Sequence, residues 1–411
     1  MEIRPILSTL RRHKTAAALI VVEIALACAI ICNALFIVSQ RWESLQETSG
    51  IAEHELVTVS LRGIGKQINP DVVRQQDLAA LRAVPGVTNV AVVTQLPFRR
   101  GSNNSSLTLT PDQKVATLNA AMYSGDEGTL DTLGLQLVAG RAFHPDDYMD
   151  WSELMTLLNS SSGVPLRTLP LMVTREAAQT LFPGGSAIGK QVYMANVPFT
   201  IVGVLQRLRR PNKPDGNSSY SMLLPLRPNH TNGGFYVLRV GDPAQRGRVL
   251  HEAVDALNRV DPNRLVIAQK TFDDWRSEYF SNDRDMMGLL ITLCLALLLV
   301  TALGIIGLAS FWVAQRTRQI GVRRALGATR GQILRYFQTE NFLLVSAGIV
   351  LGMVLAYAIN QLLMSRYELP RLPLVYLPVG AVLLWALGQI AVLWPARRAA
   401  NVPPAIATRS A

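Results

Sequence analysis

Four long and nearly uncharged apolar runs constrain the fold of this 411-residue chain more than any other feature. They cover Ala16–Val38, Met286–Val313, Phe342–Met364 and Tyr376–Leu393, and Glu23 is the only acidic or basic residue in them. A helix of the length of the first run measures about 34 Å, which is enough to cross a hydrocarbon core of about 30 Å. The sequence therefore predicts an integral membrane protein with four transmembrane α-helices.

The first run has an alternative interpretation as a cleaved signal peptide. The apolar stretch is longer than a typical signal core, and no convincing small-x-small cleavage site precedes Gln40. We therefore expect an uncleaved first transmembrane helix.

A large region without a span, residues 40–285, lies between the first and second runs. Its length of about 245 residues suffices for one large or two smaller folded lobes. Val57–Leu61 and Thr88–Thr94 have the composition of strands, and Gln75–Val84 between them has a helical pattern. The pattern predicts a large α+β extracytoplasmic domain inserted between the first two transmembrane helices.

The excess positive charge is confined to three short segments beside the predicted spans. Residues 1–15, 315–340 and 395–411 together carry thirteen basic and two acidic residues, which accounts for the whole net charge of +11. This bias is the positive-inside pattern of membrane proteins and does not indicate nucleic-acid binding. We predict that these three segments face the cytoplasm, that residues 40–285 lie on the opposite side of the membrane, and that membrane lipid surrounds the spans. Within the domain, the basic loop Arg207–Lys213 is expected to be solvated, with contact to a partner or an anionic substrate as the alternative.

The cysteines and histidines do not indicate a disulfide framework or a metal site. Cys28, Cys32 and Cys294 all lie in apolar runs, where small packing residues are expected. No metalloprotease, serine-hydrolase or paired-cysteine pattern occurs. We expect no catalytic residue, no metal ion and no cofactor bound by this chain.

One stretch, Gly184–Gln191, matches the glycine and lysine positions of a phosphate-binding loop. Gln191 stands where that loop needs a hydroxyl to hold magnesium, and a strand, not a helix, is expected to follow. Nucleotide binding is therefore not expected here.

The segment 315–340, QRTRQIGVRRALGATRGQILRYFQTE, carries the most distinctive motif. Six arginines and apolar residues at helical spacing predict a basic amphipathic helix at the membrane surface. Lipid-headgroup binding would explain the charge alone. The order Arg-x-Arg-x-Ile-Gly-x-Arg-Arg-Ala-Leu-Gly-Ala, however, closely resembles the cytoplasmic segment of permeases in the FtsX/MacB superfamily of ABC transporters. The resemblance implies docking on an ATPase through Arg316, Arg318, Ile320, Gly321, Arg323, Arg324, Ala325, Leu326, Gly327 and Ala328.

Two further stretches extend this resemblance over most of the chain. The run Leu130–Phe143 resembles a signature of the MacB-type extracytoplasmic domain, with Phe143 as an expected core anchor, and residues 394–405 resemble the family's C-terminal end. The resemblance implies one lobe built from both ends of the domain and another from its middle. It also implies a permease subunit without the fused ATPase that MacB carries before its first span. Its expected partners are a separate ATPase that binds ATP and Mg²⁺ and a second identical or similar permease, joined in a tripartite system by a periplasmic adaptor and an outer-membrane channel. The resemblance also implies a bacterial inner membrane, with residues 40–285 in the periplasm.

Small and polar residues in the spans predict close helix packing. They are Glu23, Ala25, Ala29 and Asn33 in the first span, Gly304 and Gly307 in the second, and Gly348 and Gly352 in the third. Glu23 has two interpretations, because an intramembrane carboxylate can bind a proton or substrate, or can reach a partner helix.

The function implied by the resemblance is transmission of ATP-driven motion to the inserted domain, for efflux of an antibiotic, peptide or lipid-like substrate through a tripartite system. An FtsX-like regulator of cell-wall enzymes or a lipoprotein-extraction permease is the alternative within the family. A membrane-anchored receptor or scaffold without an ATPase is the alternative from another class.

Overall fold

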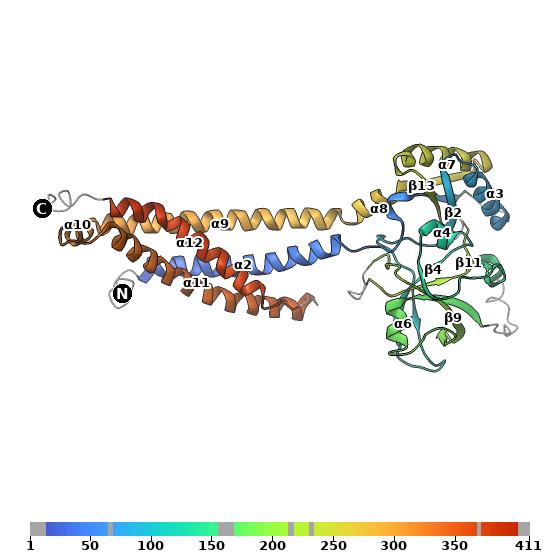
Figure 1. Ribbon diagram of the computed structural model, residues 1–411, viewed down its shortest axis with the longest axis horizontal. Helices are drawn as coiled ribbons and strands as arrows, with labels where there is room; N and C mark the ends of the chain where they lie inside the picture. Colours follow the sequence, from blue (N-terminus) through green and yellow to red (C-terminus); the bar gives the residue numbers. More distant parts are fainter. Residues whose placement is uncertain are drawn as a thin grey trace. The chain divides into compact units, whose positions relative to one another are not determined.

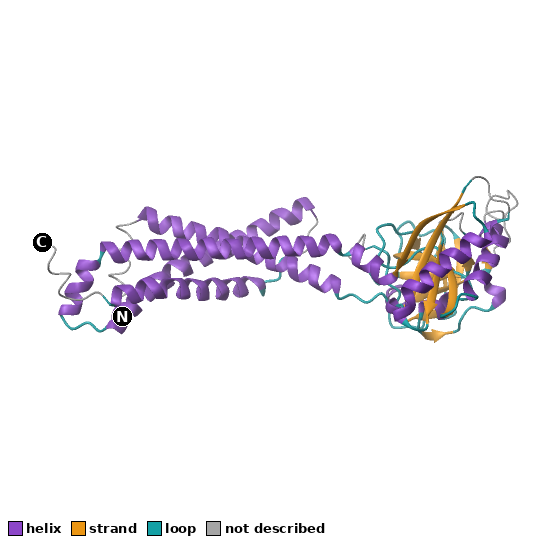
Figure 2. Cartoon of the chain, turned by 90° about the horizontal axis from the view of Figure 1, so that it is seen from above, coloured by secondary structure: helices purple, strands orange, loops and turns teal. Residues whose placement is uncertain are grey.

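The computed structural model describes residues 14–64, 69–154, 168–212, 218–229, 234–367 and 371–401 (Figures 1 and 2). The chain divides into two units, which we call the membrane unit (Met1–Gln46 with Asn282–Ala411) and the inserted domain (Glu47–Ser281). Every strand drawn in Figure 2 belongs to the inserted domain. The basic N-terminus up to residue 13, the serine-rich stretch 155–167 and the tail from residue 402 lie outside the described residues.

The membrane unit contains the four predicted transmembrane helices, as α2 (Lys14–Leu45), α9 (Ser281–Gln315), α11 (Arg330–Tyr367) and α12 (Tyr376–Ala400). All four are long and apolar enough to span a bilayer. The prediction of four spans with a large α+β domain after the first is confirmed.

The core of the membrane unit lies where α2, α11 and α12 meet, and three glycines bring these helices together. A Cβ at Gly352 would lie 2.5 Å from the Cβ of Cys28, and one at Gly380 would lie 2.5 Å from the Sγ of Cys32. One at Gly388 would lie 2.9 Å from Val345. Helix α9 differs, because only 11% of its most apolar stretch is buried within the chain, against 56% in α2.

The first sheet of the inserted domain takes its strands from both ends of the domain. The order is β13 (Arg264–Thr271), β1 (Leu56–Gly63), β12 (Phe235–Val240) and β2 (Val87–Val93), and each neighbouring pair is antiparallel. Helices α3 (Pro70–Arg82) and α7 (Arg246–Val260) pack on this sheet around a core of Val, Leu and Tyr side chains. In Figure 1 both helices lie beside β13 and β2.

A second, seven-stranded sheet comes from the middle of the domain. Its order is β3 (Asn104–Leu107), β4 (Leu118–Ser124), β10 (Ser221–Leu224), β7 (Leu169–Thr174), β9 (Val197–Leu205) and β5 (Leu137–Gly140), with β8 (Gln191–Met194) also paired to β9. The pairs β4–β10 and β7–β9 are parallel and the others are antiparallel. Helix α6 (Arg175–Leu181) and a small sheet of β6 (Met149–Asp150) and β11 (Leu226–Arg227) complete this part, whereas α4 (Thr129–Leu133) lies against β2 and β12 of the first sheet.

The phosphate-loop look-alike is a turn that leads into strand β8. Gly184 and Gly189 have φ values of +74° and +78°, where glycine is favoured. The amide of Gly189 donates to the carbonyl of Ile201 at 2.8 Å, and that of Lys190 donates to Ala187 at 3.1 Å. These amides are used within the fold, and the expectation that a strand follows the turn is confirmed.

The expectation that Phe143 anchors the core is wrong. Its side chain is half-buried and meets the ring of Tyr148 edge-on at 5.7 Å, at the start of an exposed turn. Strand β5, which precedes it, is exposed along its whole length.

Candidate coupling site

The basic segment 315–340 folds as two helices and not as the single amphipathic helix that its pattern predicts. Helix α10 spans Thr317–Ala325, and α11 begins at Arg330. Gly327 between them has a φ of +98°, a backbone conformation that terminates helices and favours glycine. Thr329 then caps α11. Its hydroxyl accepts from the backbone amide of Gln332, and the Gln332 side-chain oxygen accepts from the backbone amide of Thr329.

Part of the segment is buried and holds α10 in place. The Arg316 Nη1 donates to both oxygens of Glu340 at 2.8 and 3.0 Å, and Glu340 is only 1% exposed. Ile320 packs with Phe337 of α11 and Ala396 of α12 in a small apolar cluster. A buried ion pair is costly to disrupt, so it fixes the start of α10 against α11.

Another part of the segment faces outward and is free to meet a partner. Arg318, Val322 and Leu326 follow one another at a spacing of four, which places them on one side of α10. Leu326 is 83% exposed and Val322 is 45% exposed. Arg323 is also exposed, and its guanidinium lies 5.2 Å from the ring centroid of Tyr336. We call these four residues the outward face.

The ten residues predicted for ATPase docking therefore have different structural positions. Those buried are Arg316, Ile320 and Gly321; those half-buried are Arg324 and Ala328; those exposed are Arg318, Arg323, Ala325, Leu326 and Gly327. Arg324 donates to the carbonyl of Ala400 on α12 at 3.1 Å. Sequence reasoning did not identify Val322, although its spacing from Arg318 and Leu326 could have indicated it, and it assigned no role to Glu340.

Most of the predicted helix-packing residues also meet across the membrane unit. Gly348 packs against Ile24, where a Cβ would lie 2.7 Å from the Ile24 Cβ. The Asn33 Nδ2 donates to the carbonyls of Ala29 at 2.9 Å and Ala356 at 3.2 Å. Gly304 packs against Glu23, whereas a Cβ at Gly307 would have no atom of the described residues within 4 Å. Ala25 and Ala29 are each 1% exposed, and Gly352 meets Cys28 as described above.

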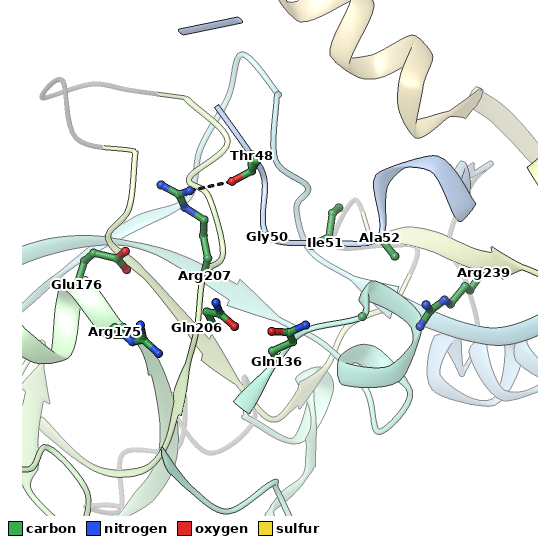
Figure 3. Close-up of a pocket in the computed structure, with 11 residues that line it drawn as sticks. Thr48, Gly50, Ile51, Ala52, Gln136, Arg175, Glu176, Gln206, Arg207 and Arg239 are labelled. Carbon is green, nitrogen blue, oxygen red and sulfur yellow. Dashed lines mark hydrogen bonds between the residues drawn. The ribbon is translucent and has the colours of Figure 1, made fainter. Parts of the chain in front are cut away.

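The inserted domain contains a polar pocket of about 600 Å³ (Figure 3). Its lining includes three arginines, one glutamate and two glutamines: Arg175, Arg207, Arg239, Glu176, Gln136 and Gln206. The Arg207 Nη1 donates to the hydroxyl of Thr48 at 2.8 Å. Guanidinium and amide groups suit a polar ligand.

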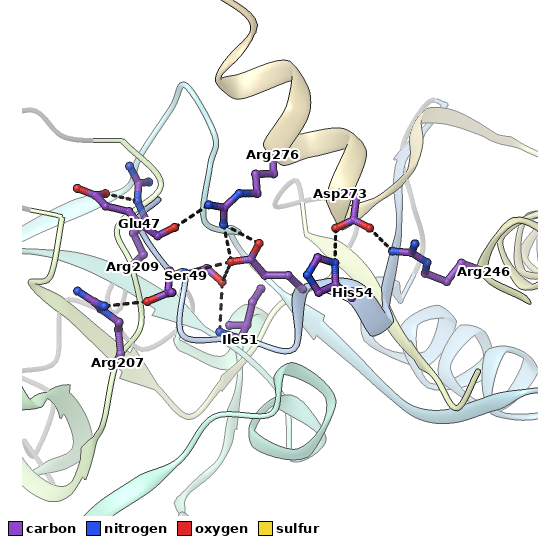
Figure 4. A network of polar contacts seen from close by, with 11 residues as sticks. Glu47, Ser49, Ile51, His54, Arg207, Arg209, Arg246, Asp273 and Arg276 are labelled. Atoms are coloured by element: carbon purple, nitrogen blue, oxygen red, sulfur yellow. Dashed lines mark hydrogen bonds and ion pairs between the residues drawn. The ribbon is translucent and has the colours of Figure 1, made fainter. Parts of the chain in front are cut away.

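Two arginines fasten the loop that follows α2 to the rest of the inserted domain (Figure 4). Arg276 of α8 (Phe272–Tyr279) donates to the carboxylate of Glu53 at 2.7 and 2.9 Å and to the carbonyl of Glu47 at 2.8 Å. The Arg209 Nε donates to the Glu47 carboxylate at 3.0 Å. Both guanidinium groups lie over the ring of Phe98, at 4.5 Å for Arg209 and 4.6 Å for Arg276.

This network corrects the expectation that the loop Arg207–Lys213 is solvated. Arg209 and Arg210 are each only 1% exposed. The Arg210 Nη2 donates to the side-chain oxygens of Asn104 at 3.0 Å and Asn119 at 2.9 Å. Burial is possible because carboxylate, carbonyl and side-chain amide oxygens between them accept from the two guanidinium groups. Residue 213 lies outside the described residues.

Comparison with known proteins agrees with this architecture. A family model of the MacB-like periplasmic core domain matches residues 18–256, and a model of the FtsX-like permease C-terminal region matches residues 291–404. The uncharacterized ABC transporter permease YknZ of Bacillus subtilis is 23% identical over 341 residues, which cover 82% of this chain and 78% of that protein. A crystal structure of the extracellular domain of YknZ from Gram-positive bacteria aligns with 51% of this chain and all of that domain, at 15% identity and a TM-score of 0.32.

The macrolide export ATP-binding/permease protein MacB of Chromobacterium violaceum is 24% identical over 299 residues. The match covers 70% of this chain but only 43% of that protein. The MacB-like model alone spans more than half of the chain. The protein therefore belongs to the family of ABC transporter permeases in which a MacB-like domain is joined to an FtsX-like membrane region.

Proposed function

We propose that this chain is a transmembrane subunit that carries ATP-driven motion from a separate ATPase to the inserted domain. In this proposal ATP and Mg²⁺ bind to the ATPase, and the outward face of α10 docks on it. The segment lies in the cytoplasm, and the inserted domain lies on the other side of a bacterial inner membrane.

The observation that carries the proposal is the exposure of Leu326 at the end of a helix whose other residues are held by burial and an ion pair. Ile320 is buried, and Arg316 is paired with Glu340. A leucine that is 83% exposed costs free energy in water unless a partner covers it. The Arg316–Glu340 pair holds this side of α10 in position, so that motion of a docked partner would be passed to α11. Arg318 and Arg323 add donors for acidic groups on that partner.

Lipid-headgroup binding also favours exposed leucine and arginine, so the experiment must separate the two. The tagged full chain is purified from cells that also produce the candidate ATPase, as wild type and as Val322→Glu/Leu326→Glu. Val115→Glu is the matched control, because Val115 of the inserted domain is 77% exposed.

Wild type and the control should recover the ATPase in equal amounts, and the double variant should recover it about tenfold less, the effect of losing about 1.4 kcal/mol of binding free energy. Equal recovery with all three chains would contradict docking through the outward face. If no ATPase co-purifies with the chain in any nucleotide state, the receptor or scaffold alternative replaces the proposal.

For the transported substrate we propose efflux of a polar or amphiphilic molecule delivered to the inserted domain. The similarity of this chain to a macrolide export protein supports export as the direction, and the polar pocket supports contact with the substrate. The assembly would contain two permease subunits, identical or similar, with two ATPase copies. A periplasmic adaptor and an outer-membrane channel would complete it.

A further inference from the structure

We propose that Glu23 is a proton-binding site inside the membrane, a neutral carboxylic acid packed on α9 that a membrane-permeant carbodiimide can modify. The proposal requires that α2 and α9 span the bilayer, but it does not depend on an ATPase. Failure of the docking experiment would leave it standing, and its own failure would leave docking untouched.

The carboxyl group of Glu23 packs against the backbone of α9 at Gly304. A Cβ at Gly304 would lie 2.7 Å from the Oε2 of Glu23, 2.8 Å from the Oε1 and 3.1 Å from the Cδ. Contacts below about 3 Å are closer than carbon and oxygen tolerate, so a side chain at position 304 would displace the flexible end of Glu23 from its present position. Gly304 therefore makes a fitted niche for the carboxyl group on α9.

No hydrogen-bond donor reaches this niche within the described part of the chain. The Oε1 of Glu23 is buried and has no partner there. Along α2 the nearest charged residues are Lys14 and Arg41, nine and eighteen positions away. At about 1.5 Å per residue these separations are about 14 and 27 Å along the helix axis.

The helices around α2 also bring no charge to this level. On α9, Asp285 lies nineteen positions before Gly304 and Arg316 lies twelve positions after it, which is about 28 and 18 Å along the axis. Level with Ile24, α11 presents Gly348, and Glu340 of that helix is eight positions away and already paired with Arg316.

The charged residues of α12 are confined to its last turn, where they are Arg397 and Arg398. The charged residues of the four described helices therefore lie well above or below the level of the niche. An ionised carboxylate in such a place would lose its hydration without gaining donors, which is far more costly than burying the neutral acid. Glu23 therefore carries a proton at neutral pH.

Loss of this proton would place a charge on the contact between α2 and α9. Helix α9 also packs Ile305 and Ala309 into the core shared with α2, and its Asp283 pairs with Arg41, so the contact at Gly304 is one of several between these two helices. The proton on Glu23 thus controls how closely these two helices pack at this depth.

The chemistry of a carbodiimide reports this proton directly. The carboxylic oxygen bonds to the central carbon of the carbodiimide while one C=N π bond breaks and the acid proton moves to that nitrogen. The acyl group then migrates from oxygen to nitrogen and gives a stable N-acylurea, with no leaving group and no oxidant. A carboxylate that lacks the proton does not start this reaction.

The decisive measurement is the infrared difference spectrum between wild type and Glu23→Gln, each as the full chain in lipid vesicles. A protonated acid has a C=O stretch above the carboxylate bands, so wild type should show one extra band at neutral pH that disappears in strong alkali. Gly304→Ala should shift the frequency of this band, and the matched control Gly307→Ala should not, because Gly307 has open space around it.

Dicyclohexylcarbodiimide labelling of the same vesicles, read by peptide mass spectrometry, is the second measurement. It should modify Glu23 and spare Glu340 and Asp283, which are paired with Arg316 and Arg41. The proposal is overturned if the acid band is absent at neutral pH, because Glu23 is then ionised. A band that Gly304→Ala leaves unchanged would overturn the contact with α9.

Discussion

Asp126 shows how burial of one residue changes the chemistry of the inserted domain. Its carboxylate is 1% exposed and accepts the amide of Val92 at 3.0 Å and that of Gly128 at 3.2 Å. Burial raises the pKa of Asp126 to about 6, although the hydrogen bond from the Val92 amide acts to lower it. The folded domain therefore binds a proton at Asp126 more tightly than the unfolded chain does.

The sign of this shift predicts how stability depends on pH. The contribution of Asp126 to the stability of the folded domain is fully present below its ordinary pKa and is lost as the pH rises through about 6. Between about pH 4 and about pH 7, the unfolding free energy of wild type should therefore fall by up to about 3 kcal/mol relative to that of Asp126→Asn. Unfolding of both chains across this range measures the difference, and a difference that stays constant with pH would contradict the assignment.

Single residues were also where the sequence was least informative. The run of arginines at 207–210 is basic and next to proline, which is typical of a solvated loop, yet Arg209 and Arg210 are buried. Their acceptors, Glu47, Asn104 and Asn119, lie about 90 to 160 positions away. Burial of a charge depends on such distant partners, and no local pattern reveals them.

At the scale of elements, one buried ion pair joins α3 to the first sheet. Asp77 of α3 accepts from Arg264 of β13 at 2.5 and 2.9 Å and from the hydroxyl of Tyr236 of β12 at 2.5 Å. Asp77 and the Arg264 side chain are at most 1% exposed. The aspartate therefore connects a helix and two strands.

Removal of this carboxylate should weaken the whole first sheet. Asp77→Asn removes the buried carboxylate that pairs with two nitrogens of Arg264, while the Asp261 carboxylate stays 3.5 Å from the Arg264 Nε; the loss should cost about 3–5 kcal/mol of unfolding free energy. Glu252→Gln is the matched control, because its pair with Arg248 lies on the exposed side of α7 and should cost at most about 1 kcal/mol. Equal losses in denaturant unfolding of the two variants would contradict the role of Asp77.

The elements themselves were partly predictable from local patterns. Alternation at Val57–Leu61 and Thr88–Thr94 identified β1 and β2, but α3 begins at Pro70, earlier than its apolar spacing indicated. Proline is favoured in the first turn of a helix and could have indicated this start. The pairing of β1 with β13 joins residues about 200 positions apart, and strand order of this kind is not contained in local sequence.

For the whole molecule, hydropathy was the reliable signal. Four spans followed from run lengths, because backbone polar groups in lipid must be satisfied within a helix. The motif identified the candidate coupling segment but did not separate the buried Arg316 from the exposed Arg323. Only the packing of α10 against α11 and α12 separates residues that hold the segment from those that can meet a partner.

The distribution of charge predicts which side of the membrane each part occupies. Leu326→Cys in α10's outward face and Val115→Cys in the inserted domain are a matched pair, since the native side chains are 83% and 77% exposed. The native cysteines can stay, because Cys28 and Cys32 are buried between helices and Cys294 lies within α9. A membrane-impermeant maleimide then reports exposure to the outside.

In spheroplasts, the maleimide should label Val115→Cys and should label Leu326→Cys only after lysis. The physical reason is that arginine-rich loops are retained on the cytoplasmic side during insertion, so the segment 315–340 should stay inside while the inserted domain is exported. Labelling of Leu326→Cys in intact spheroplasts would invert the topology and would remove the basis for docking on a cytoplasmic ATPase. Protection of both positions would instead place the inserted domain inside the cell, and export by this domain would then be excluded.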